Sequence, residues 1–465
     1  MRYISTRGQA PSLAFDDVLL AGLARDGGLY VPEAWPQFSQ SQWRALRDRP
    51  YAEIAAAVLR PFVGGTIADR DLERLAAETY AGFGHPAVAP LKQLGPGLWT
   101  MELFHGPTLA FKDYALQLVG RLFDHVLAAK GTRVMVVGAT SGDTGPAGIA
   151  ACMDRAAVDI VMLHPNGRTS PVQRRQMTTV LSANVRNIAL EGTFDDCQDA
   201  VKALFNDLEF RDRYNLSAVN SINWARVAAQ IVYYAHAALS LGAPDRAVDF
   251  CVPTGNFGNV LAAYGAKRMG LPVGRMIVAT NRNDIMARTV ATGRMALEAV
   301  APTVSPSMDV QISSNFERLM FELNARDGAA TAAMMAKFRT DGRLEFAPSQ
   351  HADLAAEFDA GACDEAATLA EIGETYRTTG ELIDPHTAVA LHVARKARRG
   401  DNPVVVASTA HPAKFPDAVE RATGVRPALP PRLTDLFERP ERVEVLPNDL
   451  ARVKQVVADL AARAR

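Results

Sequence analysis

The chain has 465 residues, of which 48% are hydrophobic and 22% are charged. This is the composition of an ordinary globular protein, and the length predicts two or three domains. The formal net charge of −1 argues against a nucleic-acid or anionic-membrane partner, and we expect neither. The four cysteines are widely spaced, which favours reduced thiols over disulfides or zinc, so we expect no metal. No apolar run is long enough for a signal peptide or a membrane span, and we expect a cytoplasmic protein.

Residues 1–90 form an N-terminal region rich in glycine, proline and aromatic residues. The segment Asp26–Pro32 is typical of a turn that leads into a short strand. Helical periodicity covers residues 42–59 and 69–80.

After residue 90, short apolar strands alternate with helices. This alternation predicts an α/β fold with open, mostly parallel sheets flanked by helices. The predicted strands are 133–137, 159–163, 185–190, 249–252, 276–280 and 403–407, and the predicted helices include 194–205, 259–269 and 386–398.

The segment 329–379 is rich in Ala, Asp, Glu and Met and is largely helical by pattern, so we expect a small helical insertion. It divides the α/β core into residues 91–328 and 380–425, which we expect to form two subdomains. A proline-rich linker and a helix over 449–463 make up the C-terminal segment 426–465.

Lys112 lies in apolar company within the segment His105–Asp113. A lysine that forms a Schiff base with an aldehyde must be neutral, and desolvation favours the neutral amine. The alternative is an ordinary surface lysine before a helix, with Asp113 as the acid of the first turn.

Two glycine-containing loops, Ser141–Gly145 and Thr254–Asn259, each follow a predicted strand. In the second loop, glycine would let the backbone approach a phosphate, and the helix after it would direct N–H groups at the ligand. The alternative is a tight turn that uses glycine for its conformation alone. A lysine together with two such loops indicates pyridoxal phosphate chemistry.

Polar residues of the first loop have two interpretations. Asp143 on its own favours a helix N-cap, whereas beside a cofactor ring it would hydrogen-bond a phenolic oxygen. The hydroxyl groups of Ser141 and Thr144 could hold a substrate carboxylate.

Four further residues could act in binding. Thr409 follows the strand 403–407 and could donate a hydrogen bond to a pyridine nitrogen or cap a helix. His411 could act as a ligand or be a hydrogen-bonded loop residue, and we favour the loop residue. Arg226 and Arg318 could each bind an anion or form a structural ion pair.

Together these motifs resemble the threonine synthases, pyridoxal-phosphate enzymes of the fold-type II (tryptophan synthase β) superfamily. The resemblance extends over most of the chain, and the N-terminal region and the insertion are similar to the longer enterobacterial and fungal class. Its other segments are 3–8, 26–32, 164–167, 191–195, 220–224, 279–284, 308–318, 383–387 and 408–415.

The resemblance implies a role for each matching residue. Lys112 would be the Schiff-base lysine, Thr409 would face the pyridine nitrogen, and Asp143 would face the ring oxygen. The phosphate of the cofactor would be cradled by Gly255, Asn256, Phe257, Gly258 and Asn259.

The implied activity is that of a carbon–oxygen lyase acting on phosphate, the last step of threonine biosynthesis. O-phospho-L-homoserine and water would give L-threonine and phosphate, with Lys112 carrying protons. The phosphate of this substrate needs a pocket of its own, for which Ser314, Asn315 and Arg318 are the candidates. We expect a monomer or a small homo-oligomer.

Three alternatives compete with this function. A related lyase or dehydratase would release a 2-oxo acid, and a silent protein would bind pyridoxal phosphate without turnover. Retention of Lys112 argues against the silent protein. A Rossmann-type dehydrogenase is disfavoured because neither glycine loop has the GxGxxG spacing.

Overall fold

The computed structural model describes residues 1–218 and 221–463. Asn220 of the 220–224 motif and the last two residues of the C-terminal segment lie outside the described residues. The chain divides into two compact units. Unit 1 contains Met1–His105 and Ser221–Pro427, and unit 2 contains Gly106–Asn220 and Ala428–Arg465.

Unit 1 is built around a six-stranded sheet with the order β13-β10-β9-β14-β4-β3. All neighbouring strands are parallel except β3 and β4. The predicted strands 249–252, 276–280 and 403–407 are confirmed as β9, β10 and β14. The strand bounds are β3 Leu91–Gly95, β4 Leu98–Glu102, β9 Val248–Pro253, β10 Val273–Thr280, β13 Phe358–Ala362 and β14 Val404–Ser408.

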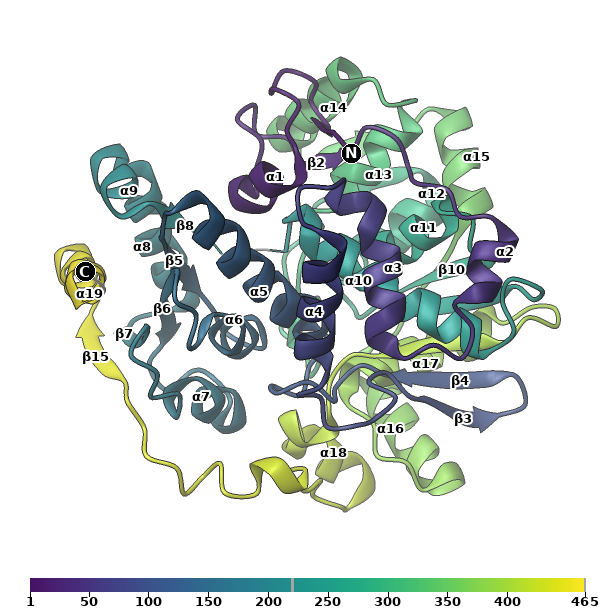
Figure 1. The fold of residues 1–465 in the computed structure, drawn as a ribbon. Coiled ribbons are helices and arrows are strands. Elements are labelled where there is room, and N and C mark those ends of the chain that lie inside the picture. Colours follow the sequence, from purple (N-terminus) through teal and green to yellow (C-terminus); the bar gives the residue numbers. More distant parts are fainter. Residues whose placement is uncertain (219–220, 464–465) are drawn as a thin grey trace. The chain divides into compact units, whose positions relative to one another are not determined.

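The central strands of this sheet are buried along their whole length, as expected for parallel strands covered on both faces. The predicted helix 386–398 is confirmed as α17 (Pro385–Ala397), which packs on β9, β10 and β14. Its Asp384 cap accepts hydrogen bonds from the backbone N–H groups of His386 and Thr387. The predicted helix 259–269 corresponds to α11 (Gly258–Arg268), which packs against α10 (Trp224–Ser240) (Figure 1).

Unit 2 contains a five-stranded, wholly parallel sheet with the order β15-β7-β6-β5-β8. The predicted strands 133–137, 159–163 and 185–190 are confirmed as β5, β6 and β7. Helices α8 (Phe194–Asn206) and α19 (Leu450–Arg463) contribute to one hydrophobic core with these strands. Helices α5 (Lys112–Lys130) and α6 (Thr144–Cys152) pack on each other. The strand bounds are β5 Val134–Ala139, β6 Val158–Pro165, β7 Val185–Glu191, β8 Leu216–Ser217 and β15 Glu444–Pro447.

The prediction of a small helical insertion over 329–379 is incomplete. The segment contains three helices, but its β13 is an edge strand of the main sheet, parallel to β10. Strand β12 pairs with β11. The bounds are α14 Gly328–Asp341, β12 Arg343–Glu345, α15 Pro348–Glu357 and α16 Glu365–Thr379, with β11 at Arg294–Ala296.

In the N-terminal region, the helix predicted over 69–80 is confirmed as α4 (Asp69–Tyr80). The single helix predicted over 42–59 is wrong, because α2 (Gln40–Ala45) ends well before α3 (Tyr51–Val63) begins. Pro50 is the N-cap of α3, and a proline disfavours helical backbone in the residue before it. The remaining elements are β1 Tyr3–Ser5, α1 Phe15–Ala21, β2 Tyr30–Pro32, α7 Pro171–Thr178, α9 Leu208–Tyr214, α12 Ile285–Thr292, η1 Pro306–Met308, α13 Phe316–Leu323, η2 Pro412–Lys414, α18 Pro416–Thr423 and η3 Pro431–Leu433.

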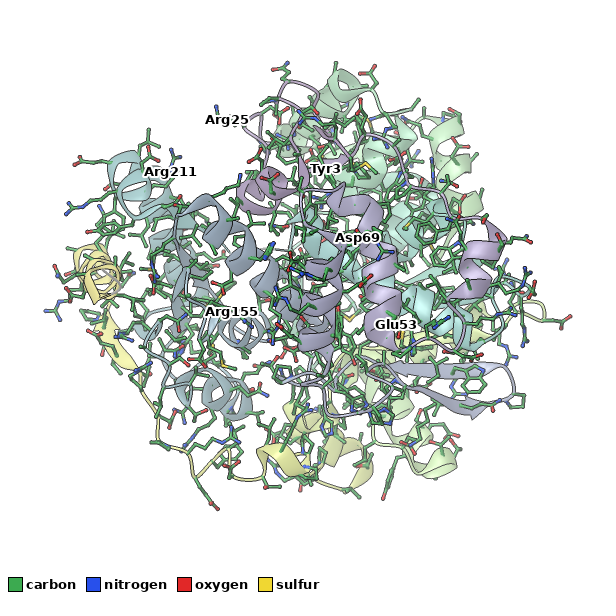
Figure 2. All side chains as sticks on the ribbon, viewed as in Figure 1. Tyr3, Arg25, Glu53, Asp69, Arg155 and Arg211 are labelled. Carbon is green, nitrogen blue, oxygen red and sulfur yellow. The ribbon has the colours of Figure 1, made fainter. Side chains whose placement is uncertain are left out.

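The first strand is anchored deep in unit 1. Tyr3, labelled in Figure 2, is fully buried, and its hydroxyl group donates to the Phe62 carbonyl at 2.7 Å. The buried Glu317 carboxylate accepts hydrogen bonds from the Thr6 hydroxyl at 2.7 Å and from Arg7 at 2.9 and 3.0 Å. Two of the resemblance motifs, 3–8 and 308–318, therefore meet in space. None of the helices among the described residues has the length and apolarity to cross a bilayer.

Candidate active site

Lys112 is the first residue of α5 and is half-buried. The turn before it is irregular, since Leu109 is a buried residue with a left-handed backbone (φ +63°). Asp113 is the fully buried acid of the first turn, as predicted, and accepts hydrogen bonds from the Thr108 N–H at 2.8 Å and hydroxyl at 2.6 Å. The acid next to Lys112 therefore fixes the turn that presents the lysine.

The loop Ser141–Gly145 joins β5 to α6. Asp143 occupies the N-cap position, but its side chain makes no capping hydrogen bond, so the preference for an N-cap carboxylate is wrong. Its carboxylate instead accepts from Gln173 Nε2 at 2.8 Å, and the Thr140 hydroxyl accepts from the Gly145 N–H at 3.0 Å. Sequence reasoning missed Gln173 because it lies thirty residues away on α7.

Ser141 is exposed and Thr144 is half-buried in this loop, so their hydroxyl groups lie near the surface of unit 2. Their proposed contact with a substrate carboxylate stays a prediction.

The loop Thr254–Asn259 joins β9 to α11 in unit 1. Phe257, rather than a glycine, is its left-handed residue (φ +61°), and it is held there by burial against Phe316, 5.1 Å between ring centres. Neither Gly255 nor Gly258 has a positive φ. A Cβ on Gly255 would lie 2.5 Å from the Ser307 carbonyl oxygen, and one on Gly258 would lie 3.1 Å from Asn315 Nδ2. These two glycines thus permit close packing against the protein.

The start of α11 fits a bound phosphate. Its N-cap residue, Phe257, makes no capping hydrogen bond, so the first N–H groups, at the positive end of the helix dipole, are not capped by that side chain and suit an anion. Asn259 Oδ1 accepts from the Tyr233 and Tyr234 hydroxyl groups at 2.5 and 2.6 Å. Among the described residues, its buried Nδ2 finds no hydrogen-bond partner. The residues present therefore fit the phosphate group of pyridoxal phosphate.

Thr409 directly follows β14 and is buried. The alternative of a helix cap is wrong for Thr409, because His411 caps the next helix, η2, by accepting from the Ala413 N–H at 3.1 Å. The interpretation of His411 as a loop residue is thereby confirmed. The neighbouring Ser408 hydroxyl lies 2.9 Å from that of Thr387, at the start of α17.

Arg318 is 1% exposed, and burial lowers its pKa to about 9. Its Nε donates to the Tyr30 carbonyl at 2.9 Å, Nη2 donates to the Ile222 carbonyl at 2.5 Å, and Nη1 donates to Asn315 Oδ1. Asn315 Nδ2 donates in turn to the carbonyl groups of Ser221 and Asn256, both at 3.1 Å. These contacts favour a structural role for both residues, and only the half-buried Ser314 of the three candidates lacks such a network in the described structure. Arg226 is a buried residue of α10.

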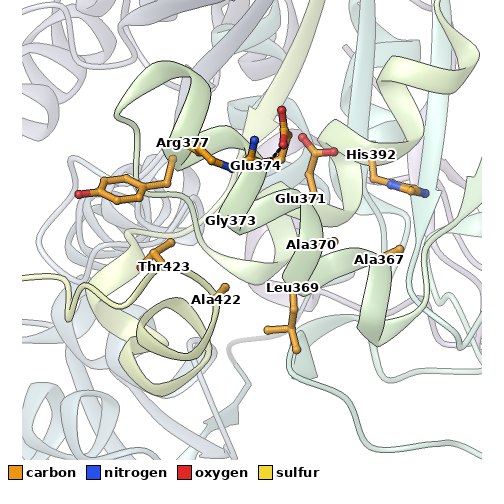
Figure 3. A pocket seen from close by; sticks show the side chains of 11 residues that line it. Ala367, Leu369, Ala370, Glu371, Gly373, Glu374, Arg377, His392, Ala422 and Thr423 are labelled. Carbon is orange, nitrogen blue, oxygen red and sulfur yellow. Dashed lines mark hydrogen bonds and ion pairs between the residues drawn. The ribbon is translucent and has the colours of Figure 1, made fainter.

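A groove elsewhere in unit 1 runs between α16, α17 and α18 (Figure 3). Glu371, Arg377, His392 and Thr423 are among its lining residues, and none of the candidate site residues lines it. Among the described residues there is no cluster of side chains suited to a metal ion.

Comparisons with known proteins agree with this site chemistry. Residues 85–409 match the pyridoxal-phosphate-dependent enzyme family, residues 2–80 match the threonine synthase N terminus, and residues 387–457 match the threonine synthase C-terminal family. The fold and these matches define a pyridoxal-phosphate-dependent enzyme of the α/β class.

Full-length relatives narrow this assignment. The threonine synthase of Pseudomonas aeruginosa is 56% identical, and the match covers 100% of both chains. The crystal structure of PLP-bound threonine synthase from Brucella melitensis has a TM-score of 0.98 at 54% identity and covers 99% of each chain. The threonine synthase structure from yeast has a TM-score of 0.95 at 36% identity with the same coverage. The chain belongs to the threonine synthase family, which confirms the predicted family, fold class and cofactor.

Proposed function

We propose that this enzyme converts O-phospho-L-homoserine and water to L-threonine and phosphate. The observation that carries the proposal is the full-length identity of 56% with a threonine synthase. Two features support it: Lys112 is retained at the start of α5, and a phosphate-compatible loop precedes α11.

In this proposal, each candidate residue keeps the role that the resemblance implies for it. In unit 2, Lys112 forms the covalent link to the cofactor and Asp143 hydrogen-bonds the oxygen on its ring. In unit 1, Thr409 donates to the pyridine nitrogen, and the loop 255–259 binds the cofactor phosphate through its N–H groups and Asn259 Nδ2. When bound, the cofactor supplies an electron sink that makes the Cα proton of the substrate acidic.

The protein then has to move protons and bind a dianionic substrate. Once the substrate amine has replaced it on the cofactor, Lys112 Nζ would take the proton from Cα. A second proton would leave Cβ as phosphate departs from Cγ, Cγ would gain a proton, and water would add at Cβ while Cα is protonated again, with Lys112 carrying these protons. Ser141 and Thr144 bind the substrate carboxylate through their hydroxyl groups. For the substrate phosphate we retain Ser314, because the donors of Asn315 and Arg318 are used within the protein.

We also propose that the enzyme acts in the cytoplasm as a monomer or small homo-oligomer. All four cysteines are free and buried, as fits a reducing compartment. Gel filtration with light scattering would measure the oligomeric state directly.

The purified holoenzyme tests the function. An absorbance scan should show the band of lysine-bound pyridoxal phosphate, and incubation with O-phosphohomoserine should release phosphate and threonine in equal amounts. Release of 2-oxobutanoate and ammonia in place of threonine would support the lyase alternative. A cofactor band without any product would support the silent protein.

A further inference from the structure

Two successive carbonyl groups of the cofactor-phosphate loop are held by one neighbouring segment of unit 1. The Ser313 hydroxyl donates to the Gly255 carbonyl at 2.5 Å. The backbone N–H and the side-chain Nδ2 of Asn315 both donate to the Asn256 carbonyl at 3.1 Å. Ser313 and Asn315 are themselves 4% and 0% exposed, so water does not compete for these bonds.

Because the peptide group is planar, the hydrogen bonds to these carbonyl groups also determine the direction of the N–H groups that follow them. In a trans peptide the C=O of one residue and the N–H of the next point in opposite directions. A Gly255 carbonyl that faces Ser313 therefore turns the Asn256 N–H away from Ser313. In the same way, the bonds to the Asn256 carbonyl turn the N–H of Phe257, the N-cap residue of α11, away from Asn315.

Arg318 sets the orientation of the Asn315 amide. Its Nη1 donates to Asn315 Oδ1, and a donor on that side requires the oxygen to face Arg318 and Nδ2 to face the loop. Arg318 is itself fixed by the Tyr30 and Ile222 carbonyl groups and lies over the Trp224 ring, 5.6 Å from its centre. A flipped amide would place an oxygen against the Asn256 carbonyl, which is repulsive.

We propose that Ser313, Asn315 and Arg318 are positioning residues that orient the N–H groups of the loop 255–259 and thereby set the affinity for the phosphate of pyridoxal phosphate. The inference rests on the proposed function, because it takes that loop as the cofactor-phosphate site. It differs from the earlier assignment of Asn315 and Arg318 to the substrate phosphate.

The test compares cofactor affinity with substrate KM in Asn315→Ala and Ser313→Ala. Apo-protein is titrated with pyridoxal phosphate and followed by absorbance, and the ³¹P NMR shift of the bound cofactor reports the surroundings of its phosphate. We expect the cofactor Kd to rise about tenfold in Asn315→Ala and about threefold in Ser313→Ala, because each variant loses a hydrogen bond to a carbonyl group of the loop. The ³¹P shift should move in both variants, while KM at saturating cofactor changes less than twofold. Ile312→Ala, an exposed neighbour, should leave the cofactor Kd unchanged.

An unchanged Kd and ³¹P shift in both variants would overturn the inference. A rise in KM with an unchanged cofactor Kd would also overturn it, in favour of substrate-phosphate binding. If Asn315→Ala fails to fold, as judged by its melting temperature, Ser313→Ala decides alone. Failure of the wild-type protein to bind pyridoxal phosphate would instead count against the proposed function.

Discussion

Phe257 shows how a single residue can shape the candidate phosphate site. A left-handed backbone costs a non-glycine residue about 1–2 kcal/mol, and Phe257 adopts it while buried among aromatic rings. The adjacent glycines have ordinary φ values and instead allow residues 307 and 315 to approach the loop. The conformation of the loop is thus fixed by packing from behind, which leaves its N–H groups for a ligand.

The prediction at this scale concerns Gly255→Ala. The added methyl group would lie 2.5 Å from the Ser307 carbonyl oxygen, so we expect unfolding free energy to fall by about 1–3 kcal/mol and cofactor binding to weaken. Gly95→Ala is the matched control, because a Cβ there meets nothing within 4 Å. Denaturant unfolding and cofactor titration measure both effects, and equal behaviour of the two variants would refute the packing argument.

At the scale of elements, Asp26 connects the motif 26–32 to the N-terminal motif 3–8 and the two residues after it. Its carboxylate accepts hydrogen bonds from the N–H groups of Gln9, Ala10 and Gly28, each at 2.9 Å, and from the Ser5 hydroxyl at 2.8 Å. Burial on its own would raise the pKa of Asp26, but these hydrogen bonds outweigh burial and lower it. The start of the chain is therefore held by a carboxylate that must be ionised.

The lowered pKa of Asp26 predicts that the free energy of unfolding depends on pH in the acid range. Because the pKa of Asp26 is lower in the folded than in the unfolded state, its stabilisation is present above the unfolded pKa of about 3.9 and is lost as pH falls through the folded pKa. Asp26→Asn should flatten the fall in unfolding free energy below about pH 4. Denaturant unfolding from pH 2.5 to 7 measures it, with the exposed Asp341→Asn as control. A wild-type slope in Asp26→Asn would contradict the assignment.

Buried strands are predicted from the sequence pattern, whereas the edge strands β13 and β15 are not. The buried strands β6, β9 and β14 consist mostly of apolar residues, and their predicted bounds lie within two residues of the observed ones at each end. The edge strand β13 contains one large apolar side chain, Phe358, and it was predicted as part of a helical segment. Strand β15 likewise lies in a segment that was predicted to be a linker. An edge strand is stabilised on one side by a partner that sequence periodicity does not reveal.

For the candidate site, the sequence likewise predicts some parts and not others. Lys112 and the two loops follow from motif and spacing, and the resemblance supplied their roles. The contacts behind them were not predictable, since Ser313 reaches a carbonyl 58 residues away in sequence. Taken alone, Asp143 and Thr409 are each compatible with a helix cap. In the structure, the Asp143 carboxylate accepts a hydrogen bond from Gln173 instead, and His411 rather than Thr409 caps the helix that follows β14.

At the scale of the whole molecule, each of the two units has a hydrophobic core formed by segments that are far apart in the sequence. The C-terminal strand β15 and helix α19 complete the hydrophobic core of unit 2. They contribute side chains that pack in one cluster with residues of β5, β6 and β7, among them Leu446, Val453, Val457 and Leu460. A hydrophobic core of unit 1 includes Val419 from α18 together with buried residues of α17. Each unit thus has its own source of stability.

Two matched core truncations test this division. Leu460→Ala should cost about 2–5 kcal/mol and accelerate hydrogen exchange in β5–β7 before it affects β9 and β10. Val419→Ala should produce the opposite pattern, since Val419 lies in the other core. Exchange measured by mass spectrometry separates the two units, and uniform acceleration in both variants would show a single cooperative core.

The central claim is that Lys112 binds the cofactor covalently, and borohydride reduction of the holoenzyme followed by peptide mapping tests it most directly. We predict a single labelled peptide with the pyridoxyl group on Lys112, and neither label nor activity in Lys112→Ala. A label on another lysine, or full activity in Lys112→Ala, would contradict the account.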